Sequence, residues 1–100
     1  MNSMINIMVR YRVKKQKIAE VKKAIREFVR QVKKREKGTL IYESFQLDKH
    51  STEFVHFMRF KDKKAEETHR KSEHVKKFVA VLYPVCEKKP IFIGLNEINI

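Results

Sequence analysis

The stretch Glu53-Phe54-Val55-His56-Phe57-Met58-Arg59-Phe60 decides the fold, because it reads as a strand with apolar residues on both sides. Alternate side chains of an extended chain point to opposite faces of a sheet. One side of this strand carries three large apolar residues and His56, and the other side carries Val55 and Phe57. A face exposed to water would be polar. The stretch therefore predicts a sheet that is covered on both faces.

The residues before this stretch supply a helix and two more strands. Residues 39–47 read as a strand, and the polar residues 48–52 predict a hairpin turn after it. Residues 4–13 alternate between two sides, which predicts a further strand. Apolar residues recur every three or four positions over residues 18–32, which predicts an amphipathic helix. Gly38 is expected to end this helix in the left-handed conformation.

The residues after the stretch predict a second helix and a last strand. Asp62 is a typical N-cap residue, and the helix is expected to run to about Tyr83, where Pro84 ends it. Ser72 is a candidate break within this helix, because serine competes for backbone hydrogen bonds. Residues 91–98 read as the last strand.

The element order is β-α-β-β-α-β, which predicts an α+β fold of the ferredoxin-like type with a four-stranded antiparallel sheet. Residues 1–100 are expected to form a single domain. Both helices should cover one face of the sheet. The apolar residues on the other face then predict a second copy packed sheet on sheet, which makes the protein a homodimer.

Composition and charge bear on location and partners. The 100 residues contain 24 Lys and Arg against 12 Asp and Glu, a formal charge of +12. This charge can indicate an anionic partner such as nucleic acid, a membrane surface or an anionic substrate. Because the basic residues are scattered, we favour a lysine-rich solvated surface. No apolar run is long enough for a membrane helix, and the first residues do not resemble a signal peptide. The single cysteine, Cys86, favours a free thiol in a reducing cytoplasm.

A nucleic-acid-binding alternative rests on the same element order. RNA-recognition modules share that order and carry stacking aromatic residues on the third strand. The residues Phe54-Val55-His56-Phe57 match the end of their motif. The preceding residues, His50-Ser51-Thr52-Glu53, lack the basic residue and the glycine that the motif requires. The sequence therefore does not favour a nucleic-acid partner, and this module is the weakest alternative.

Three histidines are candidates for chemistry. His56 lies in mid-strand among apolar residues, where a buried histidine needs a hydrogen-bond partner. His69 and His74 are five residues apart, about 140° around a continuous helix, so only a break at Ser72 would bring them together. No local carboxylate or cysteine completes a ligand set, so we predict no metal site.

Several stretches of the chain resemble one family. The third strand is followed by Lys61-Asp62 and Ala65, and then by the run His69-Arg70-Lys71-Ser72-Glu73-His74. The second strand begins with Gly38-Thr39-Leu40. The first strand ends with Val9-Arg10-Tyr11-Arg12-Val13-Lys14. In this order and spacing, residues 4–98 resemble the antibiotic biosynthesis monooxygenase superfamily, and particularly its small quinol-monooxygenase-like members.

The resemblance implies a dimeric α+β barrel with a pocket between sheet and helices in each subunit. It implies a monooxygenase that oxidises a small aromatic or quinol-type substrate with O2 and uses no cofactor. It implies His69 or His74 as the catalytic base or substrate anchor, and His56 as a hydrogen-bond partner. Phe60 would be an apolar wall of the substrate site, and Tyr42 a further substrate-binding candidate.

Two departures from the family pattern concern haem degradation. Haem-degrading members carry a tryptophan where this chain has Phe60, and a haem-ligand histidine where it has Val79. The resemblance therefore argues against haem degradation. A non-enzymatic, ligand-binding dimer of the same fold is the alternative to an oxygenase.

Overall fold

Four strands form one antiparallel sheet in the computed structural model, which describes residues 4–99. The spatial order of the strands is β2-β3-β1-β4. Their bounds are Ile5–Val13 for β1, Thr39–Gln46 for β2, Glu53–Phe60 for β3 and Cys86–Leu95 for β4. The prediction of an α+β, ferredoxin-like fold is confirmed.

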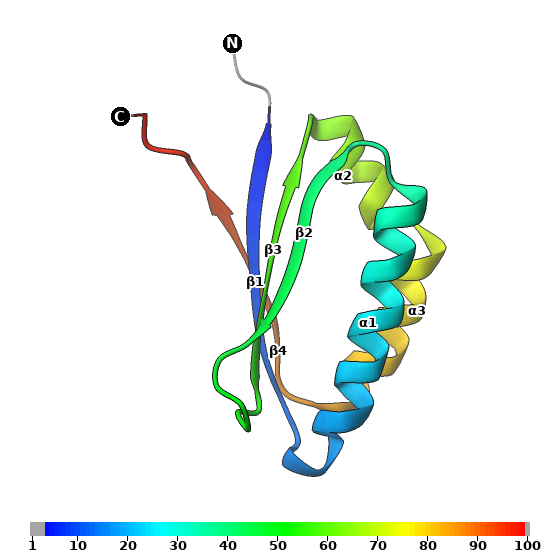
Figure 1. Ribbon diagram of the computed structural model, residues 1–100, viewed down its shortest axis with the longest axis vertical. Coiled ribbons are helices and arrows are strands. Elements are labelled where there is room, and N and C mark those ends of the chain that lie inside the picture. The colour runs from blue at the N-terminus through cyan, green and yellow to red at the C-terminus, as the bar shows by residue number, and fades with distance from the viewer. Residues whose placement is uncertain (1–3, 100) are drawn as a thin grey trace.

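The helices all lie on one face of this sheet (Figure 1). They are α1 (Ile18–Arg35), α2 (Lys63–Arg70) and α3 (Glu73–Leu82), with short 3-10 helices η1 (Lys15–Lys17) and η2 (Tyr83–Val85) beside them. The second predicted helix is thus two helices. The break falls at Ser72, whose side chain caps α3 by accepting a hydrogen bond from the Val75 backbone N–H. None of the helices in residues 4–99 is long and apolar enough to span a membrane.

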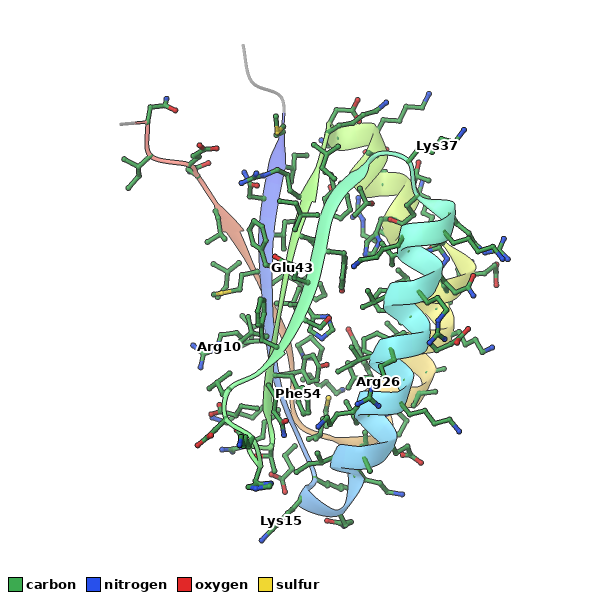
Figure 2. All side chains as sticks on the ribbon, viewed as in Figure 1. Arg10, Lys15, Arg26, Lys37, Glu43 and Phe54 are labelled. Atoms are coloured by element: carbon green, nitrogen blue, oxygen red, sulfur yellow. The ribbon has the colours of Figure 1, made fainter. Side chains whose placement is uncertain are left out.

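The core lies between the sheet and the helices. Along β3, buried residues alternate with half-buried ones, as its two-sided pattern predicts. The buried set on this strand is Phe54, His56, Met58 and Phe60. Arg10 of β1 points away from the helices (Figure 2). The sheet therefore has a helix-covered face and an open face.

Two predicted details are wrong. The last strand spans Cys86–Leu95 rather than residues 91–98. Its first half is hidden in the sequence because it is an edge strand with charged residues and Pro90, which central strands avoid. Gly38 does not adopt the left-handed conformation. Glycine is required there for a different reason, because an added Cβ would lie 2.5 Å from the Cβ of Ala65 in α2.

Candidate active site

An inner cavity of about 150 Å³ lies between the sheet and the helices. All four strands and all three α-helices contribute to its wall, which is mostly apolar. The polar side chains at the wall include Tyr11, Tyr42, His56 and His69. An apolar cavity of about 150 Å³ can hold one benzene ring. The inner cavity is therefore of the right size for a single-ring compound.

One polar group at the inner cavity is centred on His56. Its Nε2 lies 2.7 Å from the Tyr11 hydroxyl, and its Nδ1 lies 3.0 Å from the Tyr42 hydroxyl and 3.1 Å from Ser44 Oγ. Burial lowers the pKa of His56 to about 4, so the ring is neutral at pH 7. A neutral imidazole has one N–H and one lone pair. It therefore donates to one hydroxyl partner and accepts from another.

The two tyrosines of this group stay protonated. Burial raises the pKa of Tyr11 well above its ordinary value, and repulsion from the ionised forms of Tyr42 and Cys86 raises it further. Burial also raises the pKa of Tyr42, and the negative charge of Glu36 raises it further. Each hydroxyl keeps its proton, and a tyrosine hydroxyl that accepts its hydrogen bond from His56 can donate that proton to an oxygen atom of a molecule in the cavity.

A second polar group surrounds a buried carboxylate, and we call it the Glu36 cluster: Glu36, Thr39, His69 and His74. His69 Nδ1 lies 2.9 Å from each carboxylate oxygen, and Thr39 Oγ1 donates to Oε1 over 2.5 Å. His74 Nε2 contacts Oε2. The side chains of Glu36, His69 and His74 are 4%, 11% and 10% exposed. The carboxylate is therefore held almost entirely by protein donors.

The local structure explains how residues so distant in sequence meet. Glu36 is the C-cap residue of α1, directly before the chain turns into β2. His69 lies in the last turn of α2, and His74 lies in the first turn of α3. Ser72 donates to the His69 carbonyl over 2.7 Å at the break between them. The break turns both histidines toward the same carboxylate.

The carboxylate of Glu36 is charged in spite of its burial. Burial acts to raise its pKa, but hydrogen bonds from His69, Thr39 and His74 outweigh that effect and hold the pKa below its ordinary value. A charged carboxylate favours the tautomer of His69 with its proton on Nδ1. Within residues 4–99, the opposite nitrogen, Nε2, makes no hydrogen bond to another side chain.

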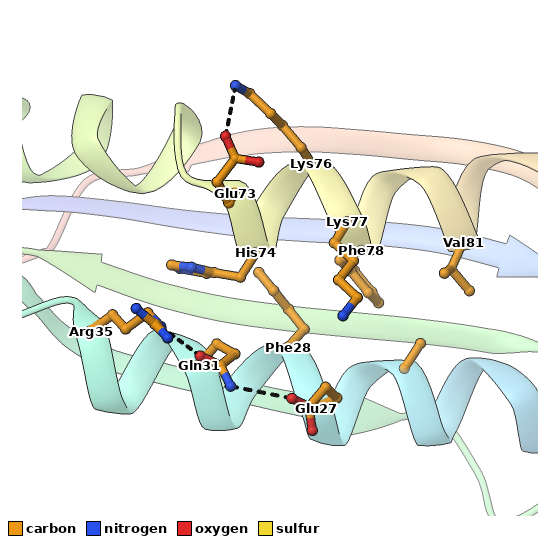
Figure 3. Close-up of a pocket in the computed structure, with 11 residues that line it drawn as sticks. Glu27, Phe28, Gln31, Arg35, Glu73, His74, Lys76, Lys77, Phe78 and Val81 are labelled. Atoms are coloured by element: carbon orange, nitrogen blue, oxygen red, sulfur yellow. Dashed lines mark hydrogen bonds and ion pairs between the residues drawn. The ribbon is translucent and has the colours of Figure 1, made fainter.

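The cluster connects two hollows. His69 lines the inner cavity, and its ring lies 5.1 Å from that of Phe60, measured between centroids. His74 instead lines an outer groove of about 780 Å³ between α1 and α3 (Figure 3). The floor of this groove includes Phe28 and Phe78, whose rings stack 4.6 Å apart. The Glu36 carboxylate is the bridge between the two histidines.

Four of the five predicted site residues line the inner cavity: Tyr42, His56, Phe60 and His69. The fifth, His74, faces the outer groove but shares the carboxylate with His69. Sequence reasoning missed Glu36 and Tyr11. One signal for Glu36 was available, because an acidic residue directly after Lys33-Lys34-Arg35 opposes the helix dipole and needs another reason to be there.

One family model matches most of the chain. The sequence model of the family described as antibiotic biosynthesis monooxygenase matches residues 4–81. No curated protein matches the chain in sequence.

Solved structures of low sequence identity share the fold. A Caulobacter crescentus protein, named provisionally as an antibiotic biosynthesis monooxygenase, has 20% identity and a TM-score of 0.89, and the match covers 98% of this chain and 92% of that one. A Nitrosomonas europaea protein with the same provisional name has 21% identity and a TM-score of 0.88, with 97% and 92% covered. A conserved protein of Methanosarcina mazei has 18% identity and a TM-score of 0.86, with 96% and 94% covered.

Proposed function

Because the chain belongs to the antibiotic biosynthesis monooxygenase family, we propose that it is a monooxygenase that oxidises a single-ring phenol or quinol with O2 and without a cofactor. The observation that carries this proposal is His69 at the wall of an apolar inner cavity of about 150 Å³, with its Nδ1 bonded to the buried carboxylate of Glu36.

His69 is the proposed catalytic base. The Glu36 carboxylate accepts a hydrogen bond from the Nδ1–H of His69, which leaves the Nε2 lone pair for a substrate hydroxyl. The charged carboxylate also stabilises the imidazolium that forms when Nε2 takes the proton. His74 supports the same carboxylate from the outer groove and is a positioning residue.

The group around His56 is the proposed anchor for a substrate oxygen. Tyr11 and Tyr42 keep their hydroxyl protons, and His56 fixes the orientation of both hydroxyls. Phe60 provides an apolar wall next to His69. Removal of water from this wall strengthens the hydrogen bonds to the substrate anion.

The reaction balances without a further reductant. A quinol loses its hydroxyl proton to His69, and the electron-rich anion reduces O2. One oxygen atom is inserted into the ring, and the other leaves as water after it regains protons. A quinol and one O2 thereby give one hydroxyquinone and one water.

The test is oxygen uptake by the full chain with a set of single-ring quinols. We expect His69→Ala to lower turnover by roughly 10²–10⁴, the usual contribution of a general base. His50→Ala is the matched control, because His50 is an exposed histidine in the β2–β3 turn. Equal turnover in wild type and His69→Ala would rule out His69 as the catalytic base. Binding of a quinol without any oxygen uptake would favour the ligand-binding dimer instead.

The proposal includes a homodimer formed by the open face of the sheet. Large apolar side chains are exposed on this face, among them Phe45 of β2 at 53% and Ile91 of β4 at 60%. A soluble protein seldom leaves such a surface bare. A second copy packed sheet on sheet would cover it.

A further inference from the structure

We infer that Glu36, His69 and His74 form a binding site for one divalent transition-metal ion of the type of Zn²⁺ or Co²⁺. They offer one carboxylate oxygen and two imidazole nitrogens, and these atoms lie within 4.8 Å of one another. Two histidines and one carboxylate are the protein ligands of catalytic zinc sites and of non-haem iron sites. This site goes beyond the proposed reaction and does not depend on it.

The donor atoms have to rearrange to bind one ion, because the two histidine nitrogens lie within 4.8 Å of each other and must approach to about 3.4 Å. Two atoms that each lie about 2.1 Å from one ion are about 3.0 Å apart at a right angle and about 3.4 Å apart at the tetrahedral angle. His69 Nδ1 already lies 2.9 Å from both Glu36 oxygens. The closer His74–Glu36 contact opens by a rotation of either side chain.

The ligands are held in place by their surroundings. The His69 ring packs 5.1 Å from Phe60, and the His74 ring packs 6.1 Å from Phe28, measured between centroids. Thr39 Oγ1 donates to Glu36 Oε1 and so orients the carboxylate from the outer side. Such outer contacts reduce the ordering that binding would otherwise require.

The ligand set and the net charge select the class of ion. Two of the three donors are imidazole nitrogens, which suit zinc, cobalt, nickel and iron, whereas Ca²⁺ and Mg²⁺ prefer oxygen. The formal charge of +12 repels every cation. Binding must therefore come from direct bonds to nitrogen, which Ca²⁺ and Mg²⁺ do not form well.

The site has access from the outer groove. His74 lines the outer groove, through which a hydrated ion can arrive (Figure 3). Three protein ligands leave a coordination position for water or another small ligand. An ion on His69 Nδ1 would leave the ring proton on Nε2, so the bound ion and the proposed base exclude each other.

The experiment is a titration of the chelator-treated full chain with Co²⁺, followed by visible absorption, and with Zn²⁺, followed by calorimetry. We expect one ion per chain and no response to Ca²⁺ or Mg²⁺. Loss of an outer contact costs roughly 10–100-fold in metal affinity. Thr39→Val should weaken binding by that factor, and Glu36→Gln and His74→Ala should weaken it more.

The control separates this site from other histidines. His50→Ala should bind Co²⁺ and Zn²⁺ as the wild type does, because His50 is exposed and outside the cluster. The inference is overturned if the wild type binds neither ion, or if Glu36→Gln and His74→Ala bind both with wild-type affinity. Circular dichroism checks the fold, and His74→Gln replaces His74→Ala if that variant unfolds. Substrate is absent throughout, so the result is independent of any oxygenase activity.

Discussion

Glu36 is the residue on which the proposed base and the proposed metal site both depend. It stands at the C-terminal end of α1, where the helix dipole favours cations. Three side-chain donors, from Thr39, His69 and His74, offset that unfavourable position and the cost of burial. The charged carboxylate is therefore stabilised at this position by the side chains that it contacts, and not by the helix dipole.

A substitution of Glu36 should separate its charge from its shape. Glu36→Gln keeps the size but removes the charge that stabilises the His69 imidazolium. We expect turnover to fall by roughly 10²–10⁴, with a smaller change in KM, in an oxygen-uptake assay. Glu27→Gln is the matched control, because Glu27 pairs with Arg30 and Gln31 on the surface of α1. Equal losses in both variants would contradict a specific role for Glu36.

His56 should make stability depend on pH. Its pKa is about 4 in the folded chain against an ordinary 6.5, because burial disfavours the charged ring. Between these two values the unfolded chain binds a proton that the folded chain does not, so stability falls as pH drops from 6.5 to 4. The full loss is roughly 3 kcal/mol. Denaturant midpoints at several pH values should show this component in the wild type and not in His56→Gln. If the stability of the wild type and of His56→Gln changed with pH in the same way, His56 would not be the source of the pH dependence.

At the scale of elements, Gly38 fixes how closely α2 approaches the start of β2. A Cβ at Gly38 would lie 2.5 Å from the Cβ of Ala65, so Gly38→Ala forces the backbone apart. Overpacking of this kind costs roughly 1–3 kcal/mol. The double variant Gly38→Ala/Ala65→Gly removes the clash, and thermal unfolding should show it to be more stable than the sum of the single changes predicts. If the effects of the two single changes on stability were strictly additive, the destabilisation by Gly38→Ala would not come from its contact with Ala65.

Elements with strong local signals could be predicted from the sequence. The β3 pattern, the α1 stripe and the Asp62 cap depend on neighbours within a few residues, and each is confirmed. The first half of β4 could not be predicted, because its pairing with β1 is irregular where Lys88 and Cys86 meet Arg12 and Val13. Edge pairing of this type is set by the partner strand and not by the β4 sequence itself.

The candidate site was predictable only in part, for the same reason. His56, His69 and Phe60 lie on elements whose inward faces the sequence pattern identifies. Glu36 is 33 residues from His69 along the chain, and their contact depends on how α1 and α2 pack. The separation between His69 and His74 depends on the helix break at Ser72, which the sequence pattern predicts only as a candidate.

At the scale of the whole molecule, rows of side chains cross the open face of the sheet. Strand pairing places Phe45, Val55, Arg10 and Ile91 in one row from β2 through β3 and β1 to β4. Residues that pair directly across strands share a face. The two ends of this row are apolar and more than half exposed. The row is therefore a contiguous patch with a charged residue inside it.

The assembly prediction follows from this row. If a second copy covers the open face, Phe45→Lys with Ile91→Lys places two charges in a buried interface. The apolar contribution lost is roughly 3–6 kcal/mol, a weakening of the dimer by about 10²–10⁴. Light scattering and sedimentation should show a dimer for the wild type at micromolar concentration and a monomer for the double variant. Val81→Lys is the matched control, because Val81 is an exposed apolar residue on α3, on the opposite side of the molecule, and its change should leave the dimer intact. A monomeric wild type would mean that the apolar row is tolerated in water, and an intact dimer in the double variant would move the interface to another surface.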